Sequence, residues 1–237
     1  MDKMFQKTAE GHGRWGGIVG DAVLGANDGI ITTFAVVAGV TGANLSPAVV
    51  LIIGFANIIA DGISMAFGNY LGTKSEKDFV ISERKREEWE IDNKPEEEIA
   101  EIREIYSNKG FEGEDLERAV HVITSDKKRW VDAMMYDELG LSSEESFKPL
   151  RSALVTLIAF AIFGILPLLA YIPVFSVENK FLTASALTGM AIFVVGALSG
   201  LAIKKNPVIS GIEMLAVGII SASAAYMAGS FISGLVK

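Results

Sequence analysis

Five long apolar stretches constrain the fold of this chain more than any other feature. Each exceeds the roughly 20 residues that an α-helix needs to cross a hydrocarbon core about 30 Å thick. Two of them begin with an N-cap residue followed by proline, at Ser46-Pro47 and Asn206-Pro207. The stretches cover residues 18–43, 47–72, 152–175, 181–203 and 208–236. We therefore predict an all-α membrane protein with five transmembrane helices.

A charged block separates the second apolar stretch from the third. Residues 73–151 hold 22 acidic and 14 basic side chains, whereas the rest of the chain holds seven of each. The net charge of −8 therefore resides in this block. We predict a soluble, acidic helical domain inserted between spans two and three. The predicted divisions are 1–72 with spans one and two, 73–148 with the insert, and 149–237 with spans three to five.

The composition excludes several classes of protein. Without cysteine the chain has no disulfide, thiolate zinc site, iron–sulfur cluster or cysteine nucleophile. The two histidines, His12 and His121, are too few for an imidazole-rich metal site. The net negative charge argues against a general nucleic-acid binder. No phosphate-binding P-loop is present, which disfavours ATP-driven pumping.

Basic residues in the short connecting segments indicate the orientation in the membrane. With the N-terminus inside, the inner segments hold five basic residues and the outer segments hold two. The five are Lys3, Lys7, Arg14, Lys204 and Lys205, and the two are Lys180 and Lys237. We therefore predict a cytoplasmic N-terminus, a cytoplasmic insert and a C-terminus outside. The compact length and the lack of a targeting extension favour a prokaryotic cell membrane over a vacuolar membrane.

Four acidic side chains lie inside the predicted spans, and no Lys or Arg within the spans balances them. Asp21 and Asp28 are in the first span, Asp61 is in the second and Glu213 is in the fifth. A charge at the bilayer centre costs roughly 2.5–3.5 kcal/mol even on a lenient insertion scale. A position near the membrane surface would lower this cost, and that alternative stays open above all for Asp21 and Glu213. Asp28 and Asp61 are therefore the stronger candidates for an ion path, and the role of Glu213 is left open.

Helical spacing groups the polar residues of the first two spans. Asp21 and Asp28 are seven residues apart and share one helix face. The second span has a polar stripe that repeats every four residues, at Asn57, Asp61, Met65 and Asn69. Glycines in both spans permit close helix packing, which is the ordinary role of small residues in membranes. Oxygen ligands with one thioether suit a divalent ion such as Fe²⁺ or Mn²⁺.

The insert combines acidic helix faces with an apolar core. It is expected to continue the second span through 73–92 and to add helices at about 96–107 and 114–139. Acidic residues recur at helical spacing, at Glu83, Glu87 and Glu90 and again at Glu98 and Glu101. The last helix has Met134, Met135 and Glu138 where its apolar face meets a polar edge. Taken alone, such a pattern is more often a solvated surface, and the Glu-x-x-His pairs of di-iron bundles are absent.

Several motifs together resemble the vacuolar iron transporter family, from Gly17 to Gly234. They are DAVLGANDG from Asp21, GISMAFGNYL from Gly62, ERKREEWE from Glu83, PEEEIAE from Pro95 and MMYDELGL from Met134. The resemblance implies a homodimer of five-span subunits, with an ion path along the two-fold axis lined by spans one and two. It places Asp28 and Met65 on that path, with Asp21 nearer the cytosol.

The resemblance also implies that the insert is a three-helix metal-binding domain. Its matching residues are Glu87, Glu90, Glu98, Glu101, Met134, Met135 and Glu138. The second span departs from the family pattern, because the glutamate usual eight residues before Met65 is Asn57 here. Asp61 lies one turn further on, roughly 6 Å away along the helix axis, and is the candidate replacement. Asn57 and Asp61 are therefore both counted as predicted path residues.

These features predict a transporter rather than an enzyme. The predicted substrate is Fe²⁺ or Mn²⁺, exported from the cytosol by proton antiport, with no permanently bound cofactor. The predicted partners are a second copy of the chain, membrane lipid, the metal ion and protons, without nucleic acid. Two alternatives remain. A membrane-anchored metal sensor would not need carboxylates inside the membrane, and an intramembrane aspartyl protease would use Asp28 and Asp61 as a pair that shares a proton.

Overall fold

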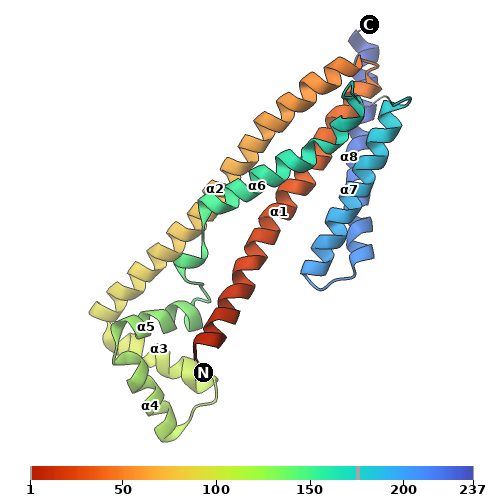
Figure 1. Cartoon of the computed structure of the whole chain (residues 1–237). Coiled ribbons are helices and arrows are strands. Elements are labelled where there is room, and N and C mark those ends of the chain that lie inside the picture. Colours follow the sequence, from red (N-terminus) through yellow and green to blue (C-terminus); the bar gives the residue numbers. More distant parts are fainter. Residues whose placement is uncertain (1, 175–176, 237) are drawn as a thin grey trace. The chain divides into compact units, whose positions relative to one another are not determined.

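The computed structural model describes residues 2–174 and 177–236, with side chains from Gly17 onward (Figure 1). All regular structure in these residues is helical. The α-helices are α1 (Asp2–Gly42), α2 (Pro47–Asn93), α3 (Pro95–Asn108), α4 (Gly113–Thr124), α5 (Lys127–Ala133), α6 (Pro149–Gly164), α7 (Lys180–Ala202) and α8 (Pro207–Val236). The shorter segments are the π-helical turn η1 (Met134–Glu138) and the 3-10 segments η2 (Glu144–Ser146) and η3 (Leu166–Tyr171).

Within the described residues, five helical segments are long and apolar enough to cross a membrane, which confirms the predicted number of spans. They are Gly17–Gly42, Pro47–Asn93, Glu144–Tyr171, Lys180–Ala202 and Pro207–Val236. Helix α2 has 47 residues. At 1.5 Å per residue it is about 70 Å long, more than twice the thickness of a hydrocarbon core. Part of α2 therefore extends beyond the membrane, and Lys74 is the first charge after its apolar half.

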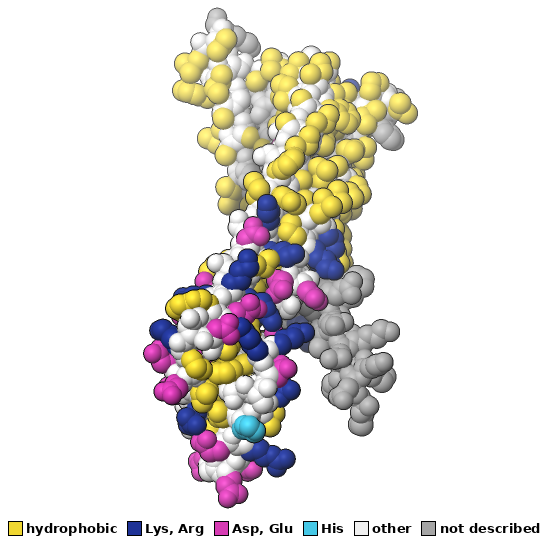
Figure 2. All heavy atoms as spheres, turned by 90° about the vertical axis from the view of Figure 1, so that its left-hand side faces the viewer, with side chains coloured by type: hydrophobic (Ala, Val, Ile, Leu, Met, Phe, Trp, Pro, Cys, Tyr) yellow, Lys and Arg dark blue, Asp and Glu magenta, His cyan; other side chains and the backbone are white. Residues whose placement is uncertain are grey.

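The chain forms two compact units. One contains Met1–Leu71 and Pro149–Lys237, and the other contains Gly72–Lys148. We call them the membrane unit and the acidic unit. On the face that Figure 2 shows, hydrophobic side chains cover the membrane unit, whereas Lys, Arg, Asp and Glu gather on the acidic unit. The side of the membrane on which the acidic unit lies stays a prediction.

Helix α1 is the centre of the membrane unit and packs against α6, α7 and α8. Its close approach to α6 depends on two glycines. A Cβ atom at Gly25 would stand 2.3 Å from the carbonyl oxygen of Thr156, and one at Gly29 would stand 2.4 Å from that of Phe160. The glycines of the first span therefore bring the backbone of α1 against the backbone of the third span, α6.

The third span is predicted over 152–175, where Pro167 and Pro173 can kink or end the helix, and the structure is interrupted just before Pro167. Helix α6 ends at Gly164, and the chain continues as the 3-10 segment η3. Pro167 accounts for the change, because it has no N–H to bond to the carbonyl of Phe163 and its ring crowds the preceding turn. Residue 175, the predicted end of this span, lies outside the described residues, as does Lys237.

The last helix of the insert differs from the prediction, which was one helix over 114–139. Helix α4 ends at Thr124 and α5 begins at Lys127. Between them, Asp126 has an extended backbone, and its Oδ1 accepts a hydrogen bond from the Arg129 N–H at 2.8 Å. An aspartate that bonds to nearby backbone in this way favours a helix start over a helix interior. Helix α5 then continues into the wider turn η1.

The acidic unit has its own hydrophobic core. Ile102 of α3 and Met134 of η1 are fully buried in it, and Trp130 of α5 is nearly so. Val80 and Ile91, from the charged half of α2, complete the same cluster. The extension of α2 is therefore part of a packed helical unit.

Candidate functional site

Two helices of the membrane unit carry the predicted path residues. Asp21 and Asp28 come from α1, and Asn57, Asp61 and Met65 come from α2. All five side chains are partly exposed. Asp61 lies near enough to Asp28 for the two negative charges to repel each other. Among the described residues, neither carboxylate takes part in a salt bridge.

A polar junction joins three helices at Asp21. The side-chain amide of Asn69 on α2 donates to Asp21 Oδ1 at 2.8 Å and to Thr156 Oγ1 at 2.7 Å. The hydroxyl of Thr156, on α6, donates to the backbone oxygen of Asp21 at 3.4 Å. Thr156 is fully buried. The junction holds the Asp21 carboxylate with a neutral donor, and Asp21 takes part in no salt bridge within the described part of the chain.

Sequence reasoning identified only part of this junction. Asn69 belongs to the stripe that repeats every four residues on the second span, but it was not assigned to the site. Thr156 was missed, because an isolated threonine in an apolar span gives no signal of its own. The four-residue repeat on the second span could have identified Asn69 as a path residue, since Asn69 is its last member.

Asn57 occupies the position where the resemblance leads us to expect a glutamate. Its Nδ2 is buried without a hydrogen-bond partner among the described residues, as is the Oδ1 of Asn27 on α1. Unpaired buried polar atoms are rare in folded proteins, and each calls for an explanation such as a functional role. Asn57 therefore keeps a polar group at the position of the family glutamate, but without a charge. The nearest carboxylate on α2 is Asp61, one turn further along.

The predicted insert glutamates lie close together in the acidic unit. Glu87 on α2 and Glu98 on α3 are each 4% exposed and are the buried acidic residues of the described chain. The Oε2 atom of Glu98 has no hydrogen-bond partner in the part of the chain that the structure describes. Glu90, Glu101 and Glu138 lie close enough to act on their charges. We call these five residues the glutamate cluster.

Burial and mutual repulsion shift the pKa values of the glutamate cluster upward. Burial raises the pKa of Glu87 to about 7, and Glu138, Glu98 and Glu90 add to the rise. Burial likewise raises the pKa of Glu98 to about 7, with further contributions from Glu101, Glu90 and Glu138. The pKa of Glu138 is also raised, by burial and then by Glu101 and Glu90. A dication bound among these groups would offset both the cost of burying the carboxylates and their mutual repulsion, since it neutralises negative charge that water no longer screens.

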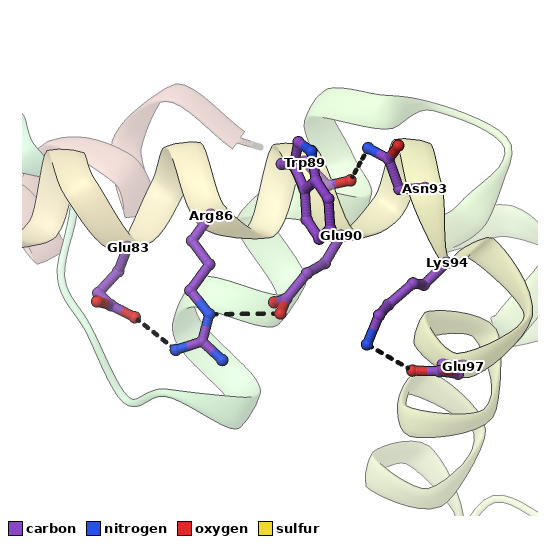
Figure 3. A network of polar contacts seen from close by, with 7 residues as sticks. All are labelled: Glu83, Arg86, Trp89, Glu90, Asn93, Lys94 and Glu97. Carbon is purple, nitrogen blue, oxygen red and sulfur yellow. Dashed lines mark hydrogen bonds and ion pairs between the residues drawn. The ribbon is translucent and has the colours of Figure 1, made fainter.

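An arginine borders the glutamate cluster (Figure 3). The Nε atom of Arg86 is 3.3 Å from Glu90 Oε1, and its Nη1 atom is 3.8 Å from Glu83 Oε2. The positive charge of Arg86 lowers the pKa of Glu87 and of Glu138, against the larger effect of burial. Its side chain is 64% exposed, so solvent weakens this influence.

Met134 and Met135 are buried in the core of the acidic unit. They lie in η1 together with Glu138, and π-helical turns are frequent at functional sites. In the part of the chain that the structure describes, no three Asp, Glu or His side chains stand close enough together to hold a metal ion as they are. The glutamate cluster is therefore a group of neighbouring carboxylates, not a closed coordination sphere.

Five spans with carboxylates inside the bilayer are typical of membrane proteins that move ions. Residues 19–230 match the model of the VIT family. The vacuolar iron transporter of Toxoplasma gondii is 40% identical over 90% of this chain and 74% of its own length. Vacuolar iron transporter 1 of Tulipa gesneriana is 35% identical over 95% of this chain and 91% of its own, and that of Arabidopsis thaliana is 36% identical over 94% and 89%.

This chain therefore belongs to the VIT family. Its similar proteins are named as transporters, not as enzymes, in agreement with the prediction from the sequence. The resemblance that the motifs indicated is confirmed over most of the chain. The protease alternative has no support from these relatives.

Proposed function

We propose that this protein transports divalent metal ions, Fe²⁺ or Mn²⁺, out of the cytosol in exchange for protons. Family membership and the names of the similar proteins support metal transport. The observation that carries the proposal is the pair Asp28 and Asp61. They come from two different spans, repel each other, and have no salt bridge within the described residues. An apolar surrounding makes such a pair costly unless a cation neutralises it.

Exchange with protons follows from the chemistry of the pair. Two neighbouring carboxylates can be neutralised by a dication or by protons, and both together would give the site an excess positive charge. A metal ion that enters therefore displaces protons, and protons that arrive from an acidic outer side release the metal. Asp21, held by Asn69, is a third carboxylate on the same face of α1.

The acidic unit would collect the ion before it enters the membrane. Carboxylates favour hard and borderline divalent cations, and methionine sulfur adds affinity for softer ones such as Fe²⁺. The glutamate cluster supplies five carboxylates, and η1 supplies Met134 and Met135. Binding at neutral pH would release protons, because the pKa values of Glu87 and Glu98 are raised to about 7.

A homodimer is part of the proposal, because the path residues of one chain remain partly exposed. On α2, the apolar side chains of Ile52, Ile59 and Phe67 are also exposed. A second copy related by a two-fold axis would place two copies of Asp28 and Met65 around one path. Cross-linking between cysteines introduced at Phe67 in a cysteine-free chain would detect such a contact.

The transport proposal is tested with the purified protein in liposomes that have an acidic interior. Uptake of Fe²⁺, Mn²⁺, Zn²⁺ and Co²⁺ and the rise of the internal pH are followed together. Uptake of Fe²⁺ or Mn²⁺ with proton release is expected, and Asp28→Ala should reduce it to background. Thr188→Val is the control, because Thr188 is equally within the membrane unit but fully buried on α7. Flux like that of the wild type in Asp28→Ala would remove Asp28 from the path.

The same liposomes separate transport from the sensor alternative. A membrane-anchored sensor would bind metal through its acidic unit without moving it across the bilayer. Metal binding without uptake by the wild-type protein would therefore favour the sensor over the transporter.

A further inference from the structure

A polar hollow lies in the membrane unit between α7 and α8, helices that carry none of the predicted path residues. Its volume is about 270 Å³. Ser199, Lys205, Ser210 and Glu213 give it a polar lining, and Met214 and Val217 are among its apolar walls. It therefore contains one positive and one negative side chain, two hydroxyls and an apolar wall.

Small residues shape the hollow. Helices α7 and α8 form an antiparallel pair joined by a short turn (Figure 1). A Cβ atom at Gly200 would stand 2.6 Å from Ser210 Oγ, and one at Gly196 would stand 2.8 Å from the backbone oxygen of Ser210. The serine hydroxyl of α8 is thus packed against the backbone of α7, beside the two charged residues.

The two charged side chains of the hollow form no salt bridge with the residues that the structure describes. Neither Lys205 nor Glu213 takes part in a salt bridge among the described residues, although both line the same hollow. Both side chains are exposed. A carboxylate on a membrane-spanning helix is costly among lipid tails, so a position within reach of the cationic groups of lipid headgroups is favoured.

With α8 centred in a bilayer, Glu213 lies at the boundary between the hydrocarbon core and the headgroups. Helix α8 has 30 residues, so it is about 45 Å long and extends beyond a hydrocarbon core of about 30 Å. Glu213 is six residues after Pro207, about 9 Å from the start of the helix. Val217, one turn further along, lies about 6 Å deeper. The hollow is therefore polar near the membrane surface and apolar towards the bilayer interior.

We propose that this hollow binds the headgroup of a phospholipid that carries a phosphate and a primary ammonium, as phosphatidylethanolamine does. Lys205 pairs with the phosphate, and the hydroxyls of Ser199 and Ser210 donate hydrogen bonds to its oxygens. Glu213 accepts hydrogen bonds from the ammonium group, and Val217 contacts the upper part of an acyl chain. Ile219 and Ile220, further along the same helix, are exposed, as expected for a surface in contact with lipid tails.

The chemistry distinguishes this headgroup from the other common ones. Phosphatidylcholine has the same charges, but its quaternary ammonium has no N–H to donate to Glu213. Phosphatidylglycerol has the phosphate without any cation, which leaves Glu213 unneutralised beside a second negative charge. The site should therefore prefer phosphatidylethanolamine to both.

The preference is measured as the thermal unfolding midpoint of the whole protein in nanodiscs of each of these three lipids. A ligand that binds only the folded state raises the midpoint, and an increase of about 3 °C in phosphatidylethanolamine over phosphatidylcholine is expected. Glu213→Gln should abolish this difference, and Lys205→Gln should lower the midpoint in phosphatidylethanolamine and in phosphatidylglycerol. Glu178→Gln, an exposed carboxylate before α7, is the control and should keep the difference.

Two further measurements complete the test. Soluble phosphoethanolamine at millimolar concentration should not shift the midpoint, and an equal shift would show that the lipid is not the occupant. Native mass spectrometry should detect phosphatidylethanolamine retained by the wild type and lost several-fold in Glu213→Gln, even if that variant unfolds earlier. Equal midpoints of the wild type in phosphatidylethanolamine and phosphatidylcholine, or an unchanged preference in Glu213→Gln, would overturn the proposal.

Discussion

The membrane unit and the acidic unit both remove carboxylates from water, but they arrange them differently. In the membrane unit, Asp21, Asp28 and Asp61 are partly exposed and spread along two helices. In the acidic unit, Glu87 and Glu98 are buried within a cluster of five glutamates. Carboxylates spread along a helix suit an ion that moves, whereas crowded carboxylates suit an ion that is held. We therefore expect changes in the membrane unit to affect flux, and changes in the acidic unit to affect binding.

The largest effect on binding is expected from removing both buried glutamates of the cluster. Glu87→Gln with Glu98→Gln should weaken binding of Fe²⁺ or Mn²⁺ by at least about tenfold, since two charges that favour a dication are lost. Calorimetry on the full-length protein in detergent measures this, with Glu104→Gln on the exposed side of α3 as the control. Unchanged affinity in the double variant would mean that the cluster is a solvated surface.

The junction around Asn69 should have an intermediate effect, and it should act on flux. Asn69→Leu removes the donor that holds Asp21 Oδ1, and Thr156→Val removes the hydroxyl that bonds to Asn69. Losing a buried hydrogen-bond partner typically costs about 1–3 kcal/mol. We expect uptake into liposomes to fall several-fold in both variants and to recover in Thr156→Ser. Loss of metal binding by the acidic unit in these variants would contradict the division of roles.

The pH dependence of the acidic unit follows from its raised pKa values. Glu87 and Glu98 have an ordinary pKa of 4.5 and a folded-state pKa of about 7. Between these values the folded protein binds more protons than the unfolded protein, so stability falls as pH rises and levels off above about 7. Hydrogen exchange of residues 72–148 without metal should therefore be faster at pH 7.5 than at pH 5, after correction for intrinsic rates. Glu87→Gln should reduce the difference in exchange rate between the two pH values. Stability that rises with pH would contradict the raised pKa values of Glu87 and Glu98.

The smallest effect is expected from Arg86, whose side chain is largely exposed. Arg86→Gln removes a positive charge next to Glu90 and Glu83, so an arriving dication meets less repulsion. Metal affinity should rise by about two- to threefold at low salt, and the gain should shrink at high salt because solvent ions screen exposed charges. A fall in affinity would instead show that Arg86 positions the ligands.

The spans could be predicted from the sequence because length and apolarity alone determine whether a helix can cross a bilayer. The interruption at Pro167 was indicated by the sequence, because proline can kink or end a helix, whereas the apolar face of residues 114–139 predicted a continuous helix through Asp126. Each break depends on one residue, through a missing N–H or a local hydrogen bond, and such effects decide a boundary without changing the periodicity.

The candidate sites were predictable where the residues are charged. Asp28, Asp61 and the glutamates could be selected from the cost of placing a carboxylate out of water. Thr156 could not be, because its role arises from contact with Asn69, 87 residues away in the chain. The burial of Glu87 and Glu98 depends likewise on how the helices of the acidic unit pack.

The central claim is that Asp28 and Asp61 together carry the metal ion across the membrane unit. Its most direct test is coupled metal and proton flux in liposomes for Asp61→Asn, with and without Asn57→Glu, which moves the carboxylate one turn along α2. We expect Asp61→Asn to lose both fluxes while the acidic unit keeps its metal affinity, and the added Asn57→Glu to restore a measurable part of them. Wild-type flux in Asp61→Asn would contradict the claim.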